Sequence, residues 1–345
     1  MGLLDRLLAR LHPQAETVLE VLPRRCLRSR YRHSGCARCA DECPAEALRF
    51  GPGQVLVDGR RCVACLACVA ACPSGALVAR DSRLDAAMRG VLSRDGPLEC
   101  CCERGVRSGR ELLLPCLGGL SLEHLAVLAA CSGDVRLHLE HCRDCRAPQV
   151  SELLARRLAR LQALVSQAGT TSPLPVQLIT QARAEAGDAV TAPGSDHQAD
   201  RRAYFRVVRE MSRQAADEAR GALREQAVLP PPPGEKQAPP RTVLLRQALE
   251  TVDIQRRGWL LPLLHTLTVD ESCTLCGACA GMCPTGALRN ERDDQTKRLV
   301  FSWAACSGCG LCQDFCRPRS IQLSPGCPVA DLAMDTITLV QREPA

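Results

Sequence analysis

The sequence predicts an α+β fold in which two small cysteine-rich modules flank a central α/β domain. A cysteine pattern occurs twice near each end of the chain, and a repeat of this kind sets the architecture. Between the repeats, short apolar runs alternate with helical patterns, which is typical of a small α/β unit. The 345 residues include 24 cysteines but only 2% aromatic residues, so the large side chains that usually fill a core are scarce.

Residues 1–23 are predicted to form an amphipathic helix. Leucines share one face, and Arg6 and Arg10 lie opposite them, which favours a packing or partner-docking helix over a membrane anchor. Those leucines are Leu3, Leu4, Leu7, Leu8 and Leu11. Asp5, Arg6 and Arg10 interrupt any apolar core, so we do not expect a secretory signal here.

The compartment is predicted from the apolar runs and the cysteines. Near the C-terminal end the longest apolar run, Trp259 to Leu264, is far too short to cross a bilayer. We therefore expect no transmembrane segment and a cytoplasmic location. Thiols stay reduced there, so this many cysteines indicates metal ligation rather than disulfides.

The first cysteine module is predicted at residues 24–82 and the second at residues 262–326. Each contains two half-motifs, and three of the four half-motifs run into a strand-like segment that ends at Leu48, Leu77 or Leu288. The first module contains Cys36, Cys39 and Cys43, followed by Cys62, Cys65, Cys68 and Cys72. The second contains Cys273, Cys276, Cys279 and Cys283, followed by Cys306, Cys309, Cys312 and Cys316.

The spacing Cys-x2-Cys-x2-Cys-x3-Cys-Pro is specific for iron–sulfur chemistry. Three closely spaced thiolates bind three irons of a cubane, and the fourth cysteine reaches the cluster of the other half-motif. Paired Cys-x2-Cys motifs alone would leave a zinc site or free thiols open, but four half-motifs with this ending favour clusters. Proline follows Cys316 only after Arg317, a departure that removes no ligand.

The two modules resemble bacterial two-cluster ferredoxins. The resemblance implies ferredoxin-like dicluster modules, four [4Fe–4S] clusters and an exchange of one ligand within each module. In the second module it implies one cluster on Cys273, Cys276, Cys279 and Cys316, and another on Cys306, Cys309, Cys312 and Cys283. In the first module it implies a cluster on Cys62, Cys65, Cys68 and Cys43.

The first half-motif departs from this pattern, because His33 stands where its first cysteine is expected. Cys26 could supply the thiolate across an arginine-rich insertion, or His33 could bind iron directly, and a three-iron cluster is the outcome if neither does. We favour Cys26, since thiolate is the usual ligand and a loop of this length closes at modest entropic cost. The expected set is Cys26, Cys36, Cys39 and Cys72.

Residues 95–182 are predicted to form the small α/β domain. If its apolar runs are parallel strands, three groups of cysteines gather at the carboxyl edge of one sheet, where open α/β sheets bind ligands. The stretch from Pro115 to Cys145 resembles the small iron–sulfur subunit of methyl-viologen-reducing hydrogenase and heterodisulfide reductase systems. That resemblance implies a further [2Fe–2S] or other metal centre. Its ligands would be Cys142, Cys145, Cys116 and one of Cys100, Cys101 and Cys102, of which Cys102 is taken as the fourth. A redox-active dithiol and inert buried thiols are the alternatives.

Residues 183–241 are predicted to be a polar helix followed by a proline-rich, unpacked linker. With clusters at both ends, the chain is predicted to relay electrons, as an electron carrier rather than an enzyme. The net charge of +6 favours a dedicated subunit of an oxidoreductase complex, and the ferredoxin resemblance implies redox partners such as formate dehydrogenases or heterodisulfide-reductase-like complexes. Nucleic acid is not expected, since base-stacking aromatic residues are missing. A subunit with thiol–disulfide chemistry and a redox sensor or maturation factor are the rival hypotheses.

Basic residues are densest at the start of the first module. This arginine run indicates either a solvated loop or a docking patch for an acidic partner. It contains Arg24, Arg25, Arg28, Arg30, Arg32 and Arg38.

Overall fold

A computed structural model describes residues 18–51, 53–94, 96–102, 105, 111–181, 236–293, 295–327 and 336–342. The described residues all belong to one compact unit. Most of the predicted N-terminal helix, and residues 182–235 with the predicted polar helix and most of the proline-rich segment, lie outside them. No helix among the described residues is both long and apolar enough to cross a membrane.

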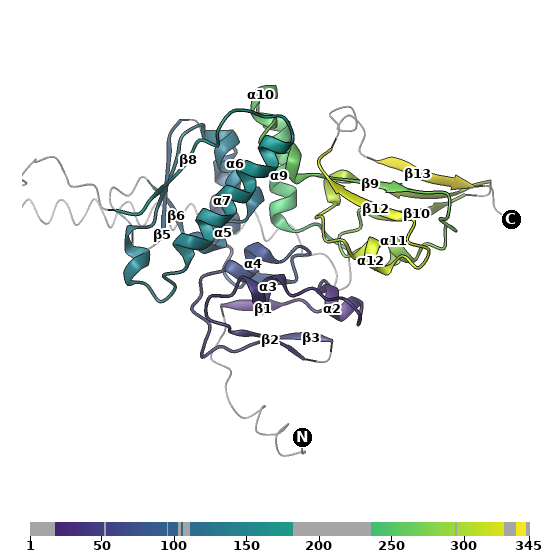
Figure 1. The fold of residues 1–345 in the computed structure, drawn as a ribbon, viewed down its shortest axis with the longest axis horizontal. Helices are drawn as coiled ribbons and strands as arrows, with labels where there is room; N and C mark the ends of the chain where they lie inside the picture. The colour runs from purple at the N-terminus through teal and green to yellow at the C-terminus, as the bar shows by residue number, and fades with distance from the viewer. Residues whose placement is uncertain are drawn as a thin grey trace, which may run out of the picture. The chain divides into compact units, whose positions relative to one another are not determined.

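Module 1 consists of two antiparallel strand pairs and three short helices (Figure 1). Strand β1 (Leu19–Val21) pairs with β4 (Leu77–Ala79), and β2 (Leu48–Gly51) pairs with β3 (Gln54–Val57). The helices are α2 (Leu27–Arg30), α3 (Arg38–Asp41) and α4 (Ala67–Ala71). The prediction of a helix up to residue 23 is wrong at its end, because Leu19–Val21 pairs with β4 and buries Leu19 inside the module.

The central part contains a four-stranded parallel sheet with the order β6-β5-β7-β8. Its strands are β5 (Leu98–Cys102), β6 (Leu112–Leu114), β7 (Val135–His138) and β8 (Val176–Ile179). Helices α6 (Leu122–Ser132) and α7 (Val150–Gln167) follow the predicted periodicity, and 3₁₀ turns lie at Leu117–Gly119 and Glu140–Asp144. A helix between module 1 and the sheet, α5 (Arg83–Val91), was not predicted.

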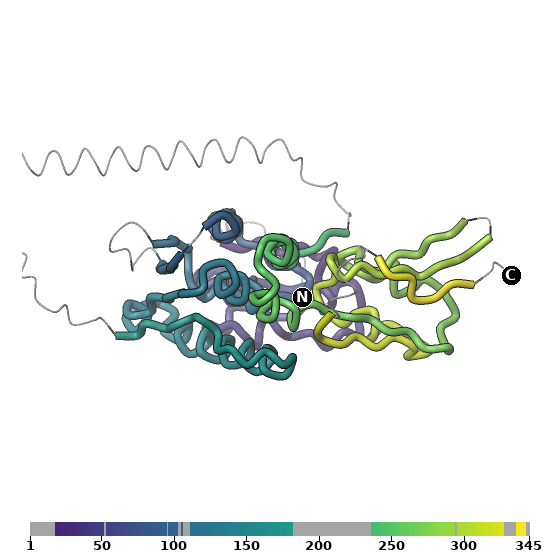
Figure 2. The backbone as a smooth tube through the Cα atoms, turned by 90° about the horizontal axis from the view of Figure 1, so that it is seen from above, coloured from purple at the N-terminus to yellow at the C-terminus, as the bar shows by residue number. Residues whose placement is uncertain are grey.

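The C-terminal end of the predicted linker is folded, although the sequence predicted an unpacked spacer there. Residues 236–239 are extended, and Pro240 begins α9 (Pro240–Thr251), in which Arg241, Thr242 and Leu245 are buried. Proline is favourable in the first turn of a helix, since its missing N–H would have no partner there. The described end of the segment 183–241 is therefore packed, not a spacer. Helix α9 packs against α6 and reaches module 2 at the 3₁₀ turn Trp303–Ala305 (Figure 2).

Module 2 has two strand systems around two short helices. Strand β9 (His265–Val269) pairs with β12 (Ile321–Pro325), and β10 (Leu288–Arg292), β11 (Lys297–Phe301) and β13 (Ile337–Arg342) form a three-stranded antiparallel sheet. Helices α11 (Ala278–Met282) and α12 (Leu311–Phe315) carry cysteines. Helix α10 (Ile254–Arg257) and a 3₁₀ turn at Leu261–Leu263 precede module 2 in the chain. The module extends beyond residue 326, because Arg342 of β13 donates a hydrogen bond to the carbonyl of Cys273 at 2.7 Å.

Candidate cluster-binding sites

In module 1, the first three cysteines of the second half-motif and Cys43 line one apolar pocket with Leu19, Ala47 and Leu48. Burial raises the pKa of Cys68, and the neighbouring thiols of Cys65 and Cys43 raise it further. This set, quartet B, consists of Cys43, Cys62, Cys65 and Cys68.

The insertion brings Cys26 to the other site of module 1. Burial raises the pKa of Cys39 to about 12, and the nearby thiols of Cys72, Cys36 and Cys26 add to this effect. All four line one pocket with Val21, Leu77 and Phe50. We name them quartet A: Cys26, Cys36, Cys39 and Cys72.

His33 lies apart from quartet A. It stacks edge-on against Tyr31, with ring centroids 5.4 Å apart, and its Nε2 accepts a hydrogen bond from Arg32 Nε at 3.0 Å. It lines a polar cavity of about 510 Å³ together with Asp314 and Arg319 of module 2. Of the two candidate fourth ligands, Cys26 and His33, it is Cys26 whose side chain lies among the other thiols of quartet A.

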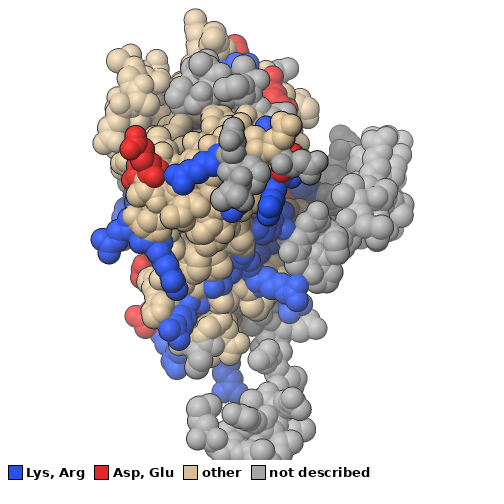
Figure 3. Space-filling model, turned by 90° about the vertical axis from the view of Figure 1, so that its right-hand side faces the viewer, with Lys and Arg blue, Asp and Glu red and all other residues tan. Residues whose placement is uncertain are grey.

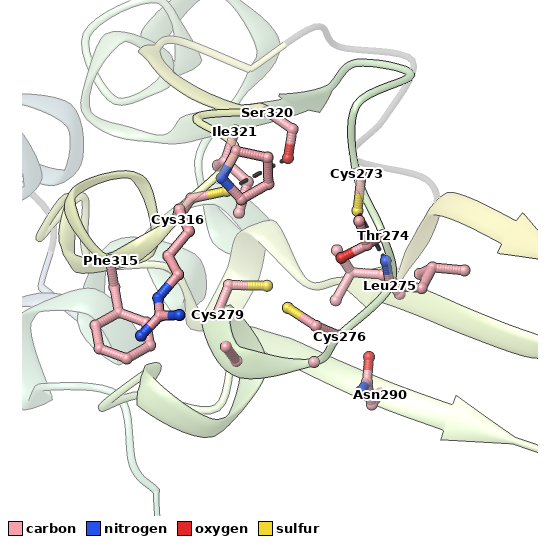
Figure 4. Close-up of a pocket in the computed structure, with 15 residues that line it drawn as sticks. Cys273, Thr274, Leu275, Cys276, Cys279, Asn290, Phe315, Cys316, Ser320 and Ile321 are labelled. Carbon is pink, nitrogen blue, oxygen red and sulfur yellow. Dashed lines mark hydrogen bonds between the residues drawn. The ribbon is translucent and has the colours of Figure 1, made fainter.

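Module 2 gathers its eight cysteines into two further sites. Quartet C (Cys273, Cys276, Cys279 and Cys316) lines a cavity of about 210 Å³. Figure 4 shows the sulfurs of Cys276 and Cys279 directed toward each other, with Cys273 and Cys316 on either side. Quartet D comprises Cys283, Cys306, Cys309 and Cys312; burial raises the pKa of Cys306 to about 12, and the thiols of Cys309 and Cys283 raise it further.

The same backbone loop recurs in three half-motifs. The second residue after the first cysteine and the residue after the second cysteine both have positive φ: Ala64 and Leu66, Leu275 and Gly277, Gly308 and Gly310. Left-handed backbone at a residue with a Cβ costs about 1–2 kcal/mol, and such strain is concentrated at functional sites. Alternating left-handed turns let three thiols face one point. In the first half-motif the corresponding Ala37 has φ of −127°, because the insertion replaces the tight loop.

In each module, the last cysteine of each half-motif lies at the site of the other half-motif, and we call these four residues the lent cysteines: Cys43, Cys72, Cys283 and Cys316. Hydrogen-bonding groups of the same module lie beside their sulfurs. The backbone N–H of Ala47 donates to Cys43 Sγ at 3.3 Å, and that of Ala76 donates to Cys72 Sγ at 3.2 Å. Hydroxyl groups lie beside three lent sulfurs, 3.3–3.8 Å away: Ser74 at Cys72, Thr285 at Cys283 and Ser320 at Cys316. Such donors favour anionic sulfur.

The arrangement fits clusters better than single ions. Among the described residues, no group of three or more His, Cys, Asp or Glu side chains is placed to hold one metal ion. Tetrahedral zinc, with Zn–S bonds of about 2.3 Å, would draw four thiolates to within roughly 4 Å of one another. The quartets instead surround pockets, and iron binding would displace the thiol protons of residues such as Cys39 and Cys279, whose pKa values burial raises.

Gly308→Ala is expected to destabilise module 2 more than Gly310→Ala. Both glycines have positive φ, +63° and +81°, so both substitutions carry the left-handed penalty of about 1–2 kcal/mol. A Cβ at Gly308 would in addition overlap the imidazole of His265, whereas nothing lies within 4 Å at Gly310. Anaerobic denaturant titration, followed by cluster absorption, should give the lower midpoint for Gly308→Ala. Equal midpoints would contradict this packing.

The central cysteines meet at the carboxyl edge of the parallel sheet. Cys102 ends β5, Cys116 follows β6, and Cys142 and Cys145 follow β7. Burial raises the pKa of Cys116 to about 12, with smaller contributions from the thiols of Cys65, Cys102 and Cys142. Cys102 and Cys145 likewise act on Cys142. The predicted set is therefore brought together, and it lies beside quartet B.

Two close contacts join this edge to module 1. A Cβ on Gly118 would lie 2.5 Å from the carbonyl oxygen of Cys65, so only glycine permits this approach. The buried Arg157 of α7 has four partners on both sides of the contact. Its Nη1 donates to the carbonyls of Gly118 (2.8 Å) and Leu120 (2.7 Å), and its Nη2 donates to Glu42 Oε2 (3.0 Å) and the Ala67 carbonyl (3.2 Å).

A second buried arginine, Arg241 of α9, joins module 1 to the central helices. Its Nε donates to Glu123 Oε1 at 3.1 Å, Nη1 donates to the Val69 carbonyl at 3.3 Å, and Nη2 donates to the carbonyl of Cys72. A cation at the end of α4 is also favourable for its carbonyl groups. The arginine clamps were not visible in the sequence, because their partners are far apart along the chain.

Comparison with known proteins agrees with this geometry. Two models described as 4Fe-4S dicluster domains match residues 32–76 and 266–317. The first match begins after Cys26, as expected if the insertion interrupts the usual spacing. The chain thus contains two 4Fe-4S dicluster domains of the ferredoxin type, one in each module.

Two curated relatives are similar over short stretches. One is a subunit of the ion-translocating oxidoreductase complex of Methanosarcina acetivorans, 37% identical over 73 residues, which is 21% of this chain and 25% of the relative. The other is the putative electron transport protein YsaA of Escherichia coli, 40% identical over 47 residues, 14% of this chain and 30% of the relative. The chain thus spans less than a third of either relative, and no solved structure matches significantly. These likenesses support an iron–sulfur electron-transfer role.

Proposed function

We propose that the chain relays single electrons between a donor and an acceptor protein through four [4Fe–4S] clusters, one in each of quartets A, B, C and D. The observation that carries this is the convergence, in four separate places, of four cysteines drawn from two segments of the same module. When bound, each cluster supplies a one-electron couple.

The protein's own contribution is to hold and tune these sites. The quartets are largely buried, which limits solvent access, and the N–H and hydroxyl donors stabilise negative charge on sulfur. Nearby arginines favour the more negative, reduced state by Coulomb attraction. The central cysteines would hold a fifth centre, of the [2Fe–2S] type, on Cys102, Cys116, Cys142 and Cys145; its closeness to Cys65 supports a place in the same relay.

Quartet C is the best-placed contact point for a redox partner. Of the cysteines, all of which lie within the described residues, only Cys276 is exposed. The side of the molecule in Figure 3 carries many lysine and arginine side chains, which suits an acidic partner. A dedicated subunit of an anaerobic or respiratory oxidoreductase complex in the cytoplasm fits this arrangement. A formate dehydrogenase or a heterodisulfide-reductase-like complex as partner rests on resemblance alone.

Iron and sulfide analysis of anaerobically purified protein tests the relay. We expect about sixteen iron per chain and, after reduction, EPR signals of [4Fe–4S]⁺ clusters; about two further iron, lost in Cys116→Ala, would mark the central centre. Colourless protein, or stoichiometric zinc, would overturn the proposal. Full cluster content with turnover abolished by Cys142→Ala and Cys145→Ala would favour thiol–disulfide chemistry instead.

A further inference from the structure

The two modules share one short segment of chain, residues 236–239, which we call the strap. The N–H of Gln237 donates to the carbonyl of Pro284 at 3.3 Å, and Lys236 Nζ donates to the carbonyl of Ala280 at 2.6 Å. These contacts fix one end of the strap to the loop that carries Cys283 of quartet D.

The other end of the strap lies against the equivalent loop of module 1. Added Cβ atoms on Gly75 and on Gly286 would each lie 3.2 Å from a strap side chain, Pro239 and Lys236 respectively. These glycines occupy the same position, three residues after the lent cysteines Cys72 and Cys283. The strap thus lies between the lent-cysteine loops of quartets A and D.

The insertion of module 1 makes a second connection at the same place. Arg30 Nε donates to the carbonyl of Met282 at 2.8 Å, and its Nη2 donates to that of Gly281 at 3.0 Å. These carbonyls end α11, directly before Cys283, where a cation is favourable. The insertion is therefore neither a free loop nor a free patch: Arg25, Arg28 and Arg30 bind Gln237 and backbone carbonyls within the molecule.

Arg38 carries a positive charge within the cysteine-bearing loop of quartet A, between Cys36 and Cys39 in the sequence. Burial raises the pKa of Cys309 of quartet D to about 11, and the charge of Arg38 partly offsets this rise. Module 1 also approaches quartet C: Tyr31 stacks edge-on against Phe315 with centroids 5.2 Å apart, and Gly35, directly before Cys36, lines the polar cavity of about 510 Å³ together with Cys316. On that side a polar cavity lies between Gly35 and Cys316, whereas the strap and Arg30 make direct hydrogen bonds beside Cys283 of quartet D.

We infer that electrons cross between the modules from quartet A to quartet D, at the junction formed by the strap and Arg30. This rests on the relay proposed above and orders it: central cysteines, B, A, D, then C. The shared strap and the Arg30 hydrogen bonds place the loops that carry Cys72 of quartet A and Cys283 of quartet D next to each other.

Potentiometric titration followed by EPR tests the junction. Arg38→Gln removes a positive charge and should therefore lower the reduction potential of one cluster in each module. At a fixed potential, the ratio of reduced to oxidised cluster should fall by at least about twofold. Arg38→Lys should restore it, and Arg49→Gln, an exposed arginine of β2, should leave it unchanged. A shift confined to module 1 would overturn the junction while leaving the relay intact; absence of clusters would instead defeat the relay.

A matched pair of cluster deletions gives a second readout. Cys312→Ala removes a ligand of D, and Cys279→Ala removes the corresponding ligand of C. In the reduced protein, only Cys312→Ala should slow the spin relaxation of a module 1 cluster. Cys312→Ala should also abolish the shift in reduction potential that Arg38→Gln causes in module 2. The opposite pattern would place quartet C at the junction.

Discussion

Cys26→Ala is expected to cost the protein one cluster, whereas His33→Ala is expected to keep all four. Cys26 lines the same pocket as Cys36, Cys39 and Cys72, while His33 lies in a polar cavity against module 2. Iron content should fall from about sixteen to about twelve per chain, or to about fifteen with a three-iron EPR signal if three thiolates retain part of the cluster.

The His33→Ala protein is the matched control for this experiment. It keeps the length and the charge-bearing arginines of the insertion, and it changes only the competing donor. Loss of the cluster in His33→Ala together with sixteen iron in Cys26→Ala would show that imidazole is the ligand. The redox potential would then also be expected to lie higher than in a four-thiolate site.

Arg157→Met is expected to destabilise the protein by about 3 kcal/mol, because buried partners of a charged side chain are left unsatisfied. The substitution keeps most of the apolar stem but removes donors to Gly118, Leu120, Glu42 and Ala67. Chemical denaturation of the anaerobic holoprotein, followed by far-UV circular dichroism, measures the change.

Arg156→Met is the control, one residue earlier on the same helix. Arg156 is exposed and makes an i,i+4 ion pair with Glu152 at 3.2 Å, a contact worth about 0.5 kcal/mol or less. The two midpoints should therefore differ clearly. Similar midpoints would mean that the link between the central domain and module 1 depends on packing alone.

The cysteine spacing predicted the modules because cluster chemistry imposes it locally. Short-range patterns also predicted the cysteine groups at the carboxyl edge of the sheet. The strand-like segments were predicted to end at Leu48, Leu77 and Leu288, but the strands begin at these residues. The sequence favoured Cys26 over His33 or a three-iron cluster on general chemistry alone, and only the fold places Cys26 in one pocket with Cys36, Cys39 and Cys72. That placement depends on how the insertion folds against module 2.

Long-range features could not be predicted in this way. Pro239 and Pro240 were interpreted as part of a spacer, although proline is also a good first residue of a helix. The burial of Arg241, Thr242 and Leu245 shows that α9 is packed. The arginine run was interpreted as a solvated loop or a docking patch. Its internal partners were not visible, because the carbonyl groups that bind Arg30 lie far along the chain in module 2. A single sequence carries no signal for such partners.

The bond from Arg241 to the carbonyl of Cys72 spans 169 residues of chain, and this has a consequence during biosynthesis. At about 5–20 residues per second, module 1 leaves the ribosome roughly ten to thirty seconds before the helix that covers it. During that interval the loop that carries Cys72 lacks its cover by Arg241, although Gly118 and Arg157 emerge earlier and can already contact the loop of Cys65 and Ala67. Module 1 is thus expected to receive its metal on the nascent chain, before the cover closes.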